Sequence, residues 1–415
     1  MKTLSRIALA AAVTLVLGNA MAADAPASAP AKPQVSAASA KDLQAAQKAL
    51  NDKKYDEALV VLEKAKANPK KSDYDDYVIS EFTFTAYAGQ KNYEGAEVPL
   101  EAAMASKYMP PDELKQRLSQ AAILNYQLKN YPKAIELGNR SVEAGNANDQ
   151  LMLVLAESYY LNNDFKNTSA TAGTAVDAEL KAGQTPSEDV LRLGLSGVAK
   201  LNDAAGEAHW LELMVTYHPN QEYWGELIDT LYHNKLTDKQ TLQVYRLSAE
   251  VGVLKHGADY SEMAQLALDA GSPGEAVSTL NTAFAANAFT DAAEKSRNQQ
   301  LLDSAKKKAA VDQPTLAKME VEAGNAKTGD GLIGAGLGYF SYGDYPKAIT
   351  DLSGGLAKGT AKESSDARLL LGIAQLKSGD KDSAVKTFQS VQGDAVYQRL
   401  AALWVLRAKA PPQAS

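Results

Sequence analysis

Three residue patterns in this 415-residue chain could carry chemistry, and the first is typical of serine acylases. Ser-x-x-Lys occurs at Ser304, Ser378 and Ser383, and Lys-Thr-Gly occurs at 327–329. Enzymes that combine these motifs to act on peptidoglycan also use Ser-Asp-Asn, which is missing from this sequence. The roughly twenty residues between Ser304 and Lys-Thr-Gly are also too few to hold a catalytic domain. We interpret these matches as chance and expect no enzyme.

The second pattern is a group of histidines that could bind a metal. All four histidines of the chain lie within 48 residues, at His209, His218, His233 and His256. No two are three or four residues apart, so no two share one helical face at ligand distance. The chain also has no cysteine. We therefore expect no metal site.

The third pattern is a glycine string at Gly334, Gly336 and Gly338. A dinucleotide-binding site needs Gly-x-Gly-x-x-Gly after a strand, and this string is Gly-x-Gly-x-Gly inside a helical pattern. Small residues at such positions let two helices approach closely. We predict a packing role for these glycines and expect no cofactor.

The N-terminal segment predicts export. A basic start at Lys2 and Arg6 precedes an apolar run at 7–17, and Ala-Met-Ala then predicts signal-peptide cleavage between Ala22 and Ala23. The run is shorter than the about 20 residues that span a bilayer. In a Gram-negative cell the destination would be the periplasm, with no stable membrane insertion after cleavage.

Composition and charge limit the classes of partner. The formal net charge is −7, and removal of Lys2 and Arg6 lowers it to about −9. Nucleic-acid binding depends on neutralising phosphates with Lys and Arg, so we expect no nucleic-acid partner. Without cysteine there is no disulfide framework, but a mature chain of this length can bury a large core.

The elements that must position any site follow a repeat. A small residue recurs along the chain, in most repeats three positions after an aromatic residue. These small residues are Ala58, Ala96, Ala134, Thr168, Ala276, Ala348 and Ala384. The gaps are 38, 38, 34, 108, 72 and 36 residues, which gives nine steps averaging about 36. Self-similarity at such a period predicts stacked helix pairs.

The clearest unit is 332–356, where apolar and small residues at helical spacing flank a turn at 342–344. This unit resembles the tetratricopeptide repeat (TPR) family, and the matching residues are Leu332, Gly336, Tyr339, Tyr345, Ala348 and Leu352. The resemblance implies an all-α, right-handed superhelical solenoid of about ten TPR-like helix-turn-helix repeats. It is strong for 41–176 and 329–393 and poor for 186–262.

The chain is therefore predicted to have five segments. They are a signal peptide at 1–22, an Ala/Pro/Ser-rich flexible linker at 23–40, N-terminal repeats at 41–185, divergent helical repeats at 186–328 and C-terminal repeats at 329–410. In the divergent segment, Tyr217-His218-Pro219 followed by Tyr223-Trp224 is weakly similar to periplasmic repeat proteins associated with TonB systems.

The resemblance implies a scaffold or adaptor in the cell envelope that binds a protein partner of unknown identity. Tyr126, Tyr160 and Phe340 fall at an equivalent position of the first helix, where an exposed aromatic could anchor a partner. The alternative is that they bury against the neighbouring repeat. A second functional hypothesis is a module for peptidoglycan fragments or other glycans, built on a cluster of aromatic and carboxylate groups with aromatics such as Tyr217, Tyr223 and Trp224.

Overall fold

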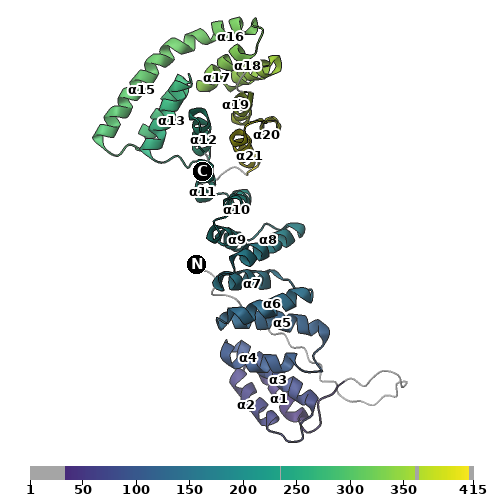
Figure 1. Ribbon diagram of the computed structural model, residues 1–415. Coiled ribbons are helices and arrows are strands. Elements are labelled where there is room, and N and C mark those ends of the chain that lie inside the picture. Colours follow the sequence, from purple (N-terminus) through teal and green to yellow (C-terminus); the bar gives the residue numbers. More distant parts are fainter. Residues whose placement is uncertain (1–32, 234, 360–363, 411–415) are drawn as a thin grey trace. The chain divides into compact units, whose positions relative to one another are not determined.

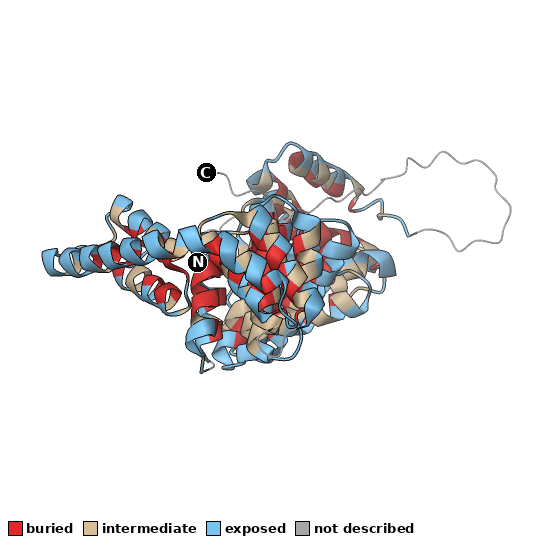
Figure 2. Ribbon diagram, turned by 90° about the horizontal axis from the view of Figure 1, so that it is seen from above, coloured by how far each residue is buried: buried red, intermediate tan, exposed pale blue. Residues whose placement is uncertain are grey.

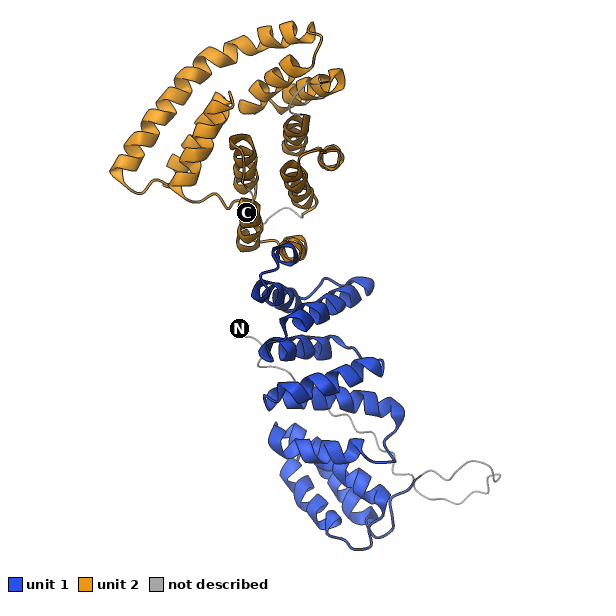
Figure 3. Ribbon diagram, in the orientation of Figure 1, with its two compact units in different colours: residues 1–207 blue, residues 208–415 orange. Residues whose placement is uncertain are grey.

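Figure 1 shows the computed structural model, which describes residues 33–233, 235–359 and 364–410. All regular structure in these residues is helical, and none of it is strand. No helix in this part of the chain is long and apolar enough to cross a membrane. The predicted cleavage site at Ala22 and Ala23 lies outside the described residues. The chain divides into two compact units, 1–207 and 208–415 (Figure 3).

Unit 1 is a series of helices in which each packs against the next along the chain. Its helices are α1 (Ala40–Asn51), α2 (Tyr55–Lys66), α3 (Asp73–Gly89), α4 (Tyr93–Met104), α5 (Pro111–Gln127), α6 (Tyr131–Glu143), α7 (Asp149–Leu161), α8 (Phe165–Lys181) and α9 (Glu188–Lys200). The residues just before α1 are ordered as well, because the Ser36 N–H donates to Asp75 Oδ1 at 2.9 Å. The end of the predicted linker therefore packs against the first repeats.

Unit 2 begins inside α10, within the segment predicted as divergent. Its elements are α10 (Ala204–Tyr217), α11 (Gln221–Asp229), the 3-10 helix η1 (Thr230–His233), α12 (Asp238–Glu250), α13 (Gly257–Asp269), α14 (Pro273–Ala285), α15 (Ala292–Asp312), η2 (Gln313–Thr315), α16 (Leu316–Gly324), α17 (Asp330–Ser341), α18 (Tyr345–Lys358), α19 (Ser364–Lys377), α20 (Lys381–Gln389) and α21 (Ala395–Lys409). Among the described residues, seven hairpins of consecutive helices pack closely, namely α1–α2, α3–α4, α5–α6, α7–α8, α13–α14, α17–α18 and α19–α20. This repeated helix-turn-helix arrangement confirms the predicted helical-repeat fold.

The small residues that set the sequence period are the contact points of these pairs. Each is the fourth residue of a second helix, namely α2, α4, α6, α8, α14, α18 or α20, and each is at most 1% exposed. These seven second helices all pack closely on the helix before them. Figure 2 shows the result, with buried and exposed faces alternating around each helix. A side chain larger than Ala or Thr would hold the two helices apart.

The turn within each close pair needs a left-handed residue. Lys53, Lys91 and Lys129 have φ of 57°, 59° and 60°, each two residues before its second helix begins. Gly343 and Gly379 occupy the same place in later pairs, where the absence of a Cβ removes the steric cost. The conformation of the turn is therefore conserved between repeats although the residue type is not.

Where the aromatic and small residues are missing, the pairing changes. α15 and α16 do not fold back on each other; they continue through η2, which contains Pro314, as one curved rod (Figure 1). α15 packs on α14, and α16 packs on α17. The loss of the sequence signal around 290–326 thus coincides with the loss of the hairpin.

Unit 2 also contains contacts between helices that are distant in sequence. α12 packs against α21, and α14 packs against α17. The first helices of the last repeats, α17, α19 and α21, therefore face the second helices α12 and α14. In a simple stack each repeat would contact only its neighbours.

The glycine string offers a matched test of helix packing. A Cβ at Gly336 would lie 2.7 Å from Leu352 Cγ, whereas a Cβ at Gly334 would meet nothing within 4 Å. We expect Gly336→Ala to destabilise unit 2 by about 1–3 kcal/mol and Gly334→Ala to stabilise it by about 0.5–1 kcal/mol. Urea unfolding followed by tryptophan fluorescence measures this, because all three tryptophans lie in unit 2. Equal effects of the two substitutions would contradict the packing role.

A buried carboxylate in α18 should make unit 2 sensitive to pH. Asp351 is 3% exposed and its Oδ2 has no hydrogen-bond partner among the described residues. Burial, and secondarily the nearby Glu320, raises the pKa of Asp351 to about 6, although Lys347 opposes the shift. A carboxyl pKa that is higher in the folded than in the unfolded state favours folding at low pH, and this contribution is lost as pH rises from about 4 through 6.

We therefore expect Asp351→Asn to flatten the pH dependence of unit 2 stability. At pH 8 the variant should be more stable than the wild type by about 1–2 kcal/mol, because it buries no unpaired charge. At pH 4 the two proteins should differ little. The measurement is the urea midpoint of each protein at both pH values, followed by tryptophan fluorescence. If the variant's stability changes between pH 4 and pH 8 as much as that of the wild type, Asp351 is not the source of the pH dependence.

Candidate partner-binding site

The three aromatics predicted to anchor a partner occupy one structural position. Each lies near the end of a first helix and makes an edge or tilted contact with the aromatic that begins the second helix. The ring-centroid distances are 6.1 Å for Tyr126–Tyr131, 5.5 Å for Tyr160–Phe165 and 5.8 Å for Phe340–Tyr345. All three therefore pack against their own turn.

Tyr126 and Tyr160 lie on α5 and α7, two first helices of unit 1 that contact each other. Both are half-buried, and the Tyr126 hydroxyl donates to Glu157 Oε2 at 2.7 Å. Burial of the ring and this hydrogen bond raise the pKa of Tyr126. Tyr126 thus braces α5 against α7. A role for either residue as a partner anchor stays a prediction.

Phe340 lies in unit 2, on the wall of a cavity. It is 9% exposed, and the Arg246 guanidinium from α12 lies over its ring, 5.3 Å from the centroid. The first-helix position that would face an open groove in a simple stack is therefore covered by α12. Its predicted role in partner binding likewise stays a prediction.

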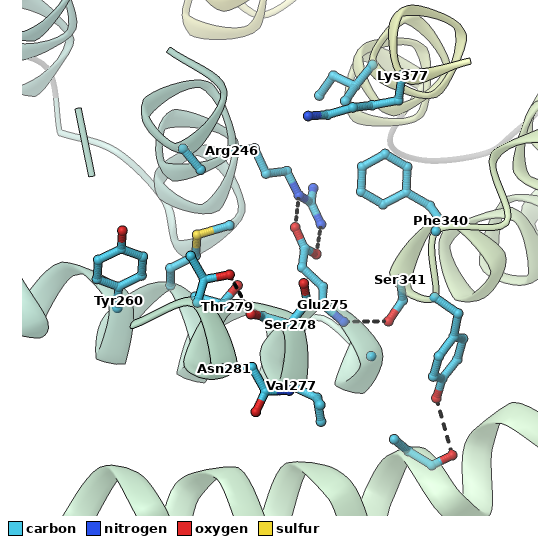
Figure 4. A pocket seen from close by; sticks show the side chains of 18 of the residues that line it. Arg246, Tyr260, Glu275, Val277, Ser278, Thr279, Asn281, Phe340, Ser341 and Lys377 are labelled. Carbon is cyan, nitrogen blue, oxygen red and sulfur yellow. Dashed lines mark hydrogen bonds and ion pairs between the residues drawn. The ribbon is translucent and has the colours of Figure 1, made fainter. Parts of the chain in front are cut away.

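The cavity is an open hollow between helices from both halves of unit 2 (Figure 4). It has a volume of about 1110 Å³ and is lined by residues of α12, α13, α14, α15, α17, α18, α19 and α21. α14 contributes a stripe of small and hydroxyl side chains at helical spacing, formed by Gly274, Ser278, Asn281, Thr282 and Ala285. Phe340 and Lys377 lie on the opposite wall (Figure 4). The cavity thus offers hydrogen-bonding groups on one side, and an aromatic ring and an ammonium group on the other.

The strongest interaction on the cavity wall is a buried ion pair between α12 and α14. Arg246 donates to both carboxylate oxygens of Glu275, at 2.8 and 2.6 Å (Figure 4). The Glu275 backbone N–H in turn donates to Ser341 Oγ at 3.1 Å, which ties α14 to α17. A bidentate pair of this kind fixes the orientation of both side chains.

A second charged group closes the cavity at the α12–α19–α21 side. Glu250 accepts from Arg407 Nη2 at 2.9 Å and forms a short ion pair with Lys377 Nζ. Both Glu250 and Arg407 are largely buried. Four of the five charged residues that line the cavity are therefore paired within the chain, and the fifth, Lys306, is exposed. This favours a ligand of mainly neutral polar character.

Sequence reasoning missed the residues that build this site. Arg246 and Glu250 lie in the divergent segment, where the repeat pattern gives no frame, and Lys377 is 127 positions away from Glu250. The only available signal was the polar composition of a segment that is otherwise helical. By contrast, two residues suggested for a glycan site, Tyr223 and Trp224, belong to the core at 2% and 0% exposure.

The histidines and acidic residues do not form a metal-binding cluster in the described part of the chain. Among those residues, no group of three or more His, Asp or Glu side chains is placed to hold a metal ion. His209 packs edge-on against Trp210, with the ring centroids 6.1 Å apart. This histidine therefore has a packing contact in unit 2.

Comparison with known proteins gives only distant structural likenesses. No protein-family model and no curated protein matches the chain. Among solved structures, a tetratricopeptide repeat protein from Parabacteroides merdae is 12% identical over 79% of this chain and 98% of its own, with a TM-score of 0.31. The TPR2AB domain of yeast Sti1, in complex with pHSP90, is 12% identical over 72% of this chain and 97% of its own, with a TM-score of 0.25.

A third solved structure, the Cut9–Hcn1 hetero-tetramer of APC/C, is 14% identical over 90% of this chain and 91% of that chain, with a TM-score of 0.25. Superposition is weak in all three cases. The class of the protein, a helical-repeat protein built from TPR-like pairs, therefore rests on the helices and contacts of this chain itself.

Removal of one partner of the Arg246–Glu275 pair should be costly. We expect Arg246→Met to destabilise unit 2 by about 3–5 kcal/mol, because it leaves the Glu275 carboxylate largely buried without its cation. The double variant Arg246→Met/Glu275→Leu should recover more than half of that loss, since no unpaired charge remains. Urea unfolding monitored by tryptophan fluorescence tests both. If the stability lost by the double variant equals the sum of the losses of Arg246→Met and Glu275→Leu, the two residues do not act as a pair.

Proposed function

We propose that this chain is a non-catalytic scaffold or adaptor of the cell envelope that binds a protein partner through the cavity of unit 2. The observation that carries the proposal is the cavity itself. Its volume of about 1110 Å³ is above the 300–1,000 Å³ typical of small-molecule sites. Ser278, Asn281 and Thr282 line it with groups suited to hydrogen bonding with an extended polypeptide backbone.

The proposed location is the periplasm. Its support is the basic start, the apolar run and the predicted cleavage between Ala22 and Ala23. A narrower form of the proposal assigns the scaffold to a TonB-dependent transport system, and its support is the short similarity around Tyr217 and Trp224. Cell fractionation with N-terminal sequencing of the mature protein tests the location, and a mature chain that still begins at Met1 would contradict it.

The second candidate is a module that binds peptidoglycan fragments or other glycans. The observation in its favour is that Tyr260, Tyr342 and Tyr345 line the cavity together with its hydroxyl groups. Of the three aromatics first suggested for such a site, Tyr223 and Trp224 belong to the core and Tyr217 is half-buried. We therefore place protein binding first.

Site-specific photocrosslinking can distinguish the two candidates. A photoreactive amino acid at Asn281, which is exposed on the cavity wall, should give a discrete adduct with an envelope protein. The same group at Val321, which is 66% exposed on α16 and is not part of the cavity lining, should give none. Identical adducts at both positions, or no adduct together with a rise in melting temperature on adding purified muropeptides, would contradict the proposal.

A substitution on the same wall of the cavity tests whether that wall is required for partner binding. Asn281→Arg places a long cation in the cavity while leaving the buried residues of α14 intact, so we expect at least a tenfold loss of partner binding. The matched control is Val321→Arg, which should leave binding unchanged. Pull-down of the partner identified by crosslinking, using each variant without the photoreactive group, gives the comparison.

A further inference from the structure

α12 is unusual because half of its buried residues are polar. Gln240, Gln243 and Arg246 are 6%, 0% and 7% exposed, and they form one stripe with Glu250 at spacings of three and four. In the other helices of the chain the buried stripe is mainly apolar or small. The buried polar stripe of α12 therefore needs specific partners.

Three of these four residues have partners in the last repeats, whereas Arg246 pairs with Glu275 of α14. Gln240 Nε2 donates to Asp394 Oδ1, at the start of α21, over 3.1 Å, and Gln243 Nε2 donates to Asp366 Oδ1 of α19 over 2.7 Å. Glu250 pairs with Lys377 of α19 and Arg407 of α21. α12 thus lies across α19 and α21 with complementary charges.

The contact leaves polar atoms unsatisfied. Gln243 Oε1 on α12, Gln375 Oε1 on α19, and Trp404 Nε1 and Arg407 Nε on α21 are buried without a hydrogen-bond partner among the described residues. A buried polar atom without a partner is disfavoured relative to the same atom in water. Separation of α12 from α19 and α21 would rehydrate these atoms, whereas separation of an apolar hairpin would expose its core.

We propose that α12 is a detachable occupant of the surface formed by α19 and α21, and that a helical segment of the partner replaces it. The replacing helix presents a carboxylate between Lys377 and Arg407 and amide donors toward Asp366 and Asp394, as α12 does. Release of α12 from α19 and α21 opens the cavity on that side, while the Arg246–Glu275 pair keeps α12 on α14. This inference rests on the proposed function only for the identity of the competing helix.

Hydrogen exchange of the full mature chain tests the detachment without any partner. Glu250→Gln removes the anion shared by two cations, and we expect amide exchange in α12 and α21 to become at least tenfold faster. α13, α14 and unit 1 should exchange as in the wild type. Addition of 0.5 M NaCl should accelerate the same two helices, because the Lys377 side chain is 40% exposed and its ion pair is screened.

Two further variants serve as controls for the exchange experiment. Glu222→Gln, at an exposed position of α11, is the matched control and should leave exchange unchanged. Lys377→Gln keeps the Arg407 contact and should give a smaller acceleration than Glu250→Gln. Exchange that stays at the wild-type rate in Glu250→Gln, or that rises equally throughout unit 2, would overturn the proposal, because the latter indicates unfolding of the unit.

A labelled peptide of residues 237–251 tests the vacated surface directly. We expect it to bind the Glu250→Gln protein at least tenfold more tightly than the wild type, in which the surface is occupied. The same peptide carrying Glu250→Gln should lose this binding. No binding of the native peptide to the variant protein would overturn the proposal, whereas failure of the crosslinking experiment alone would count only against the proposed function.

Discussion

The constraint on which the rest of the structure depends is the close approach of two helices at the fourth residue of each second helix. Ala58, Ala96 and their equivalents are almost fully buried there, so the helix axes are held at a distance that only a small side chain allows. In five of the seven pairs an aromatic three residues earlier fills the space beside the turn, and Pro273 and Lys381 occupy this position in the other two. Once this contact is set, each pair presents an apolar face that only the next pair can bury.

Relaxation of the same constraint explains the architecture of unit 2. Where the aromatic and small residues are missing, α15, η2 and α16 continue as a rod, and α12 makes few contacts with the helix before it. These elements obtain their packing from distant helices instead, and α12 obtains much of it from α19 and α21. The cavity arises because helices that meet in this way do not have the complementary small residues that let a hairpin close.

The sequence permitted prediction of what is local and periodic. The positions of Ala348 and Leu352, the turn at Gly343 and the packing role of Gly336 all follow from spacings of three, four and about 36 residues. The equivalence of Tyr126, Tyr160 and Phe340 was visible for the same reason. The cavity could not be predicted, because Gln240 and Asp394 meet across 154 positions through side chains whose types are common on any solvated helix.

Each unit contains an arginine that pairs with a glutamate and lies over a phenylalanine ring, but the two arginines join different kinds of helices. In unit 1 Arg117 lies over Phe84 and pairs with Glu81, which is 36 positions away and thus one repeat earlier. The pair joins consecutive first helices and reinforces the stack. In unit 2 Arg246 pairs with Glu275 and lies over Phe340, so it joins two second helices to a first helix from a later repeat. Polar contacts depend on geometry more strictly than apolar ones, so the Arg246 contacts set how α12, α14 and α17 meet.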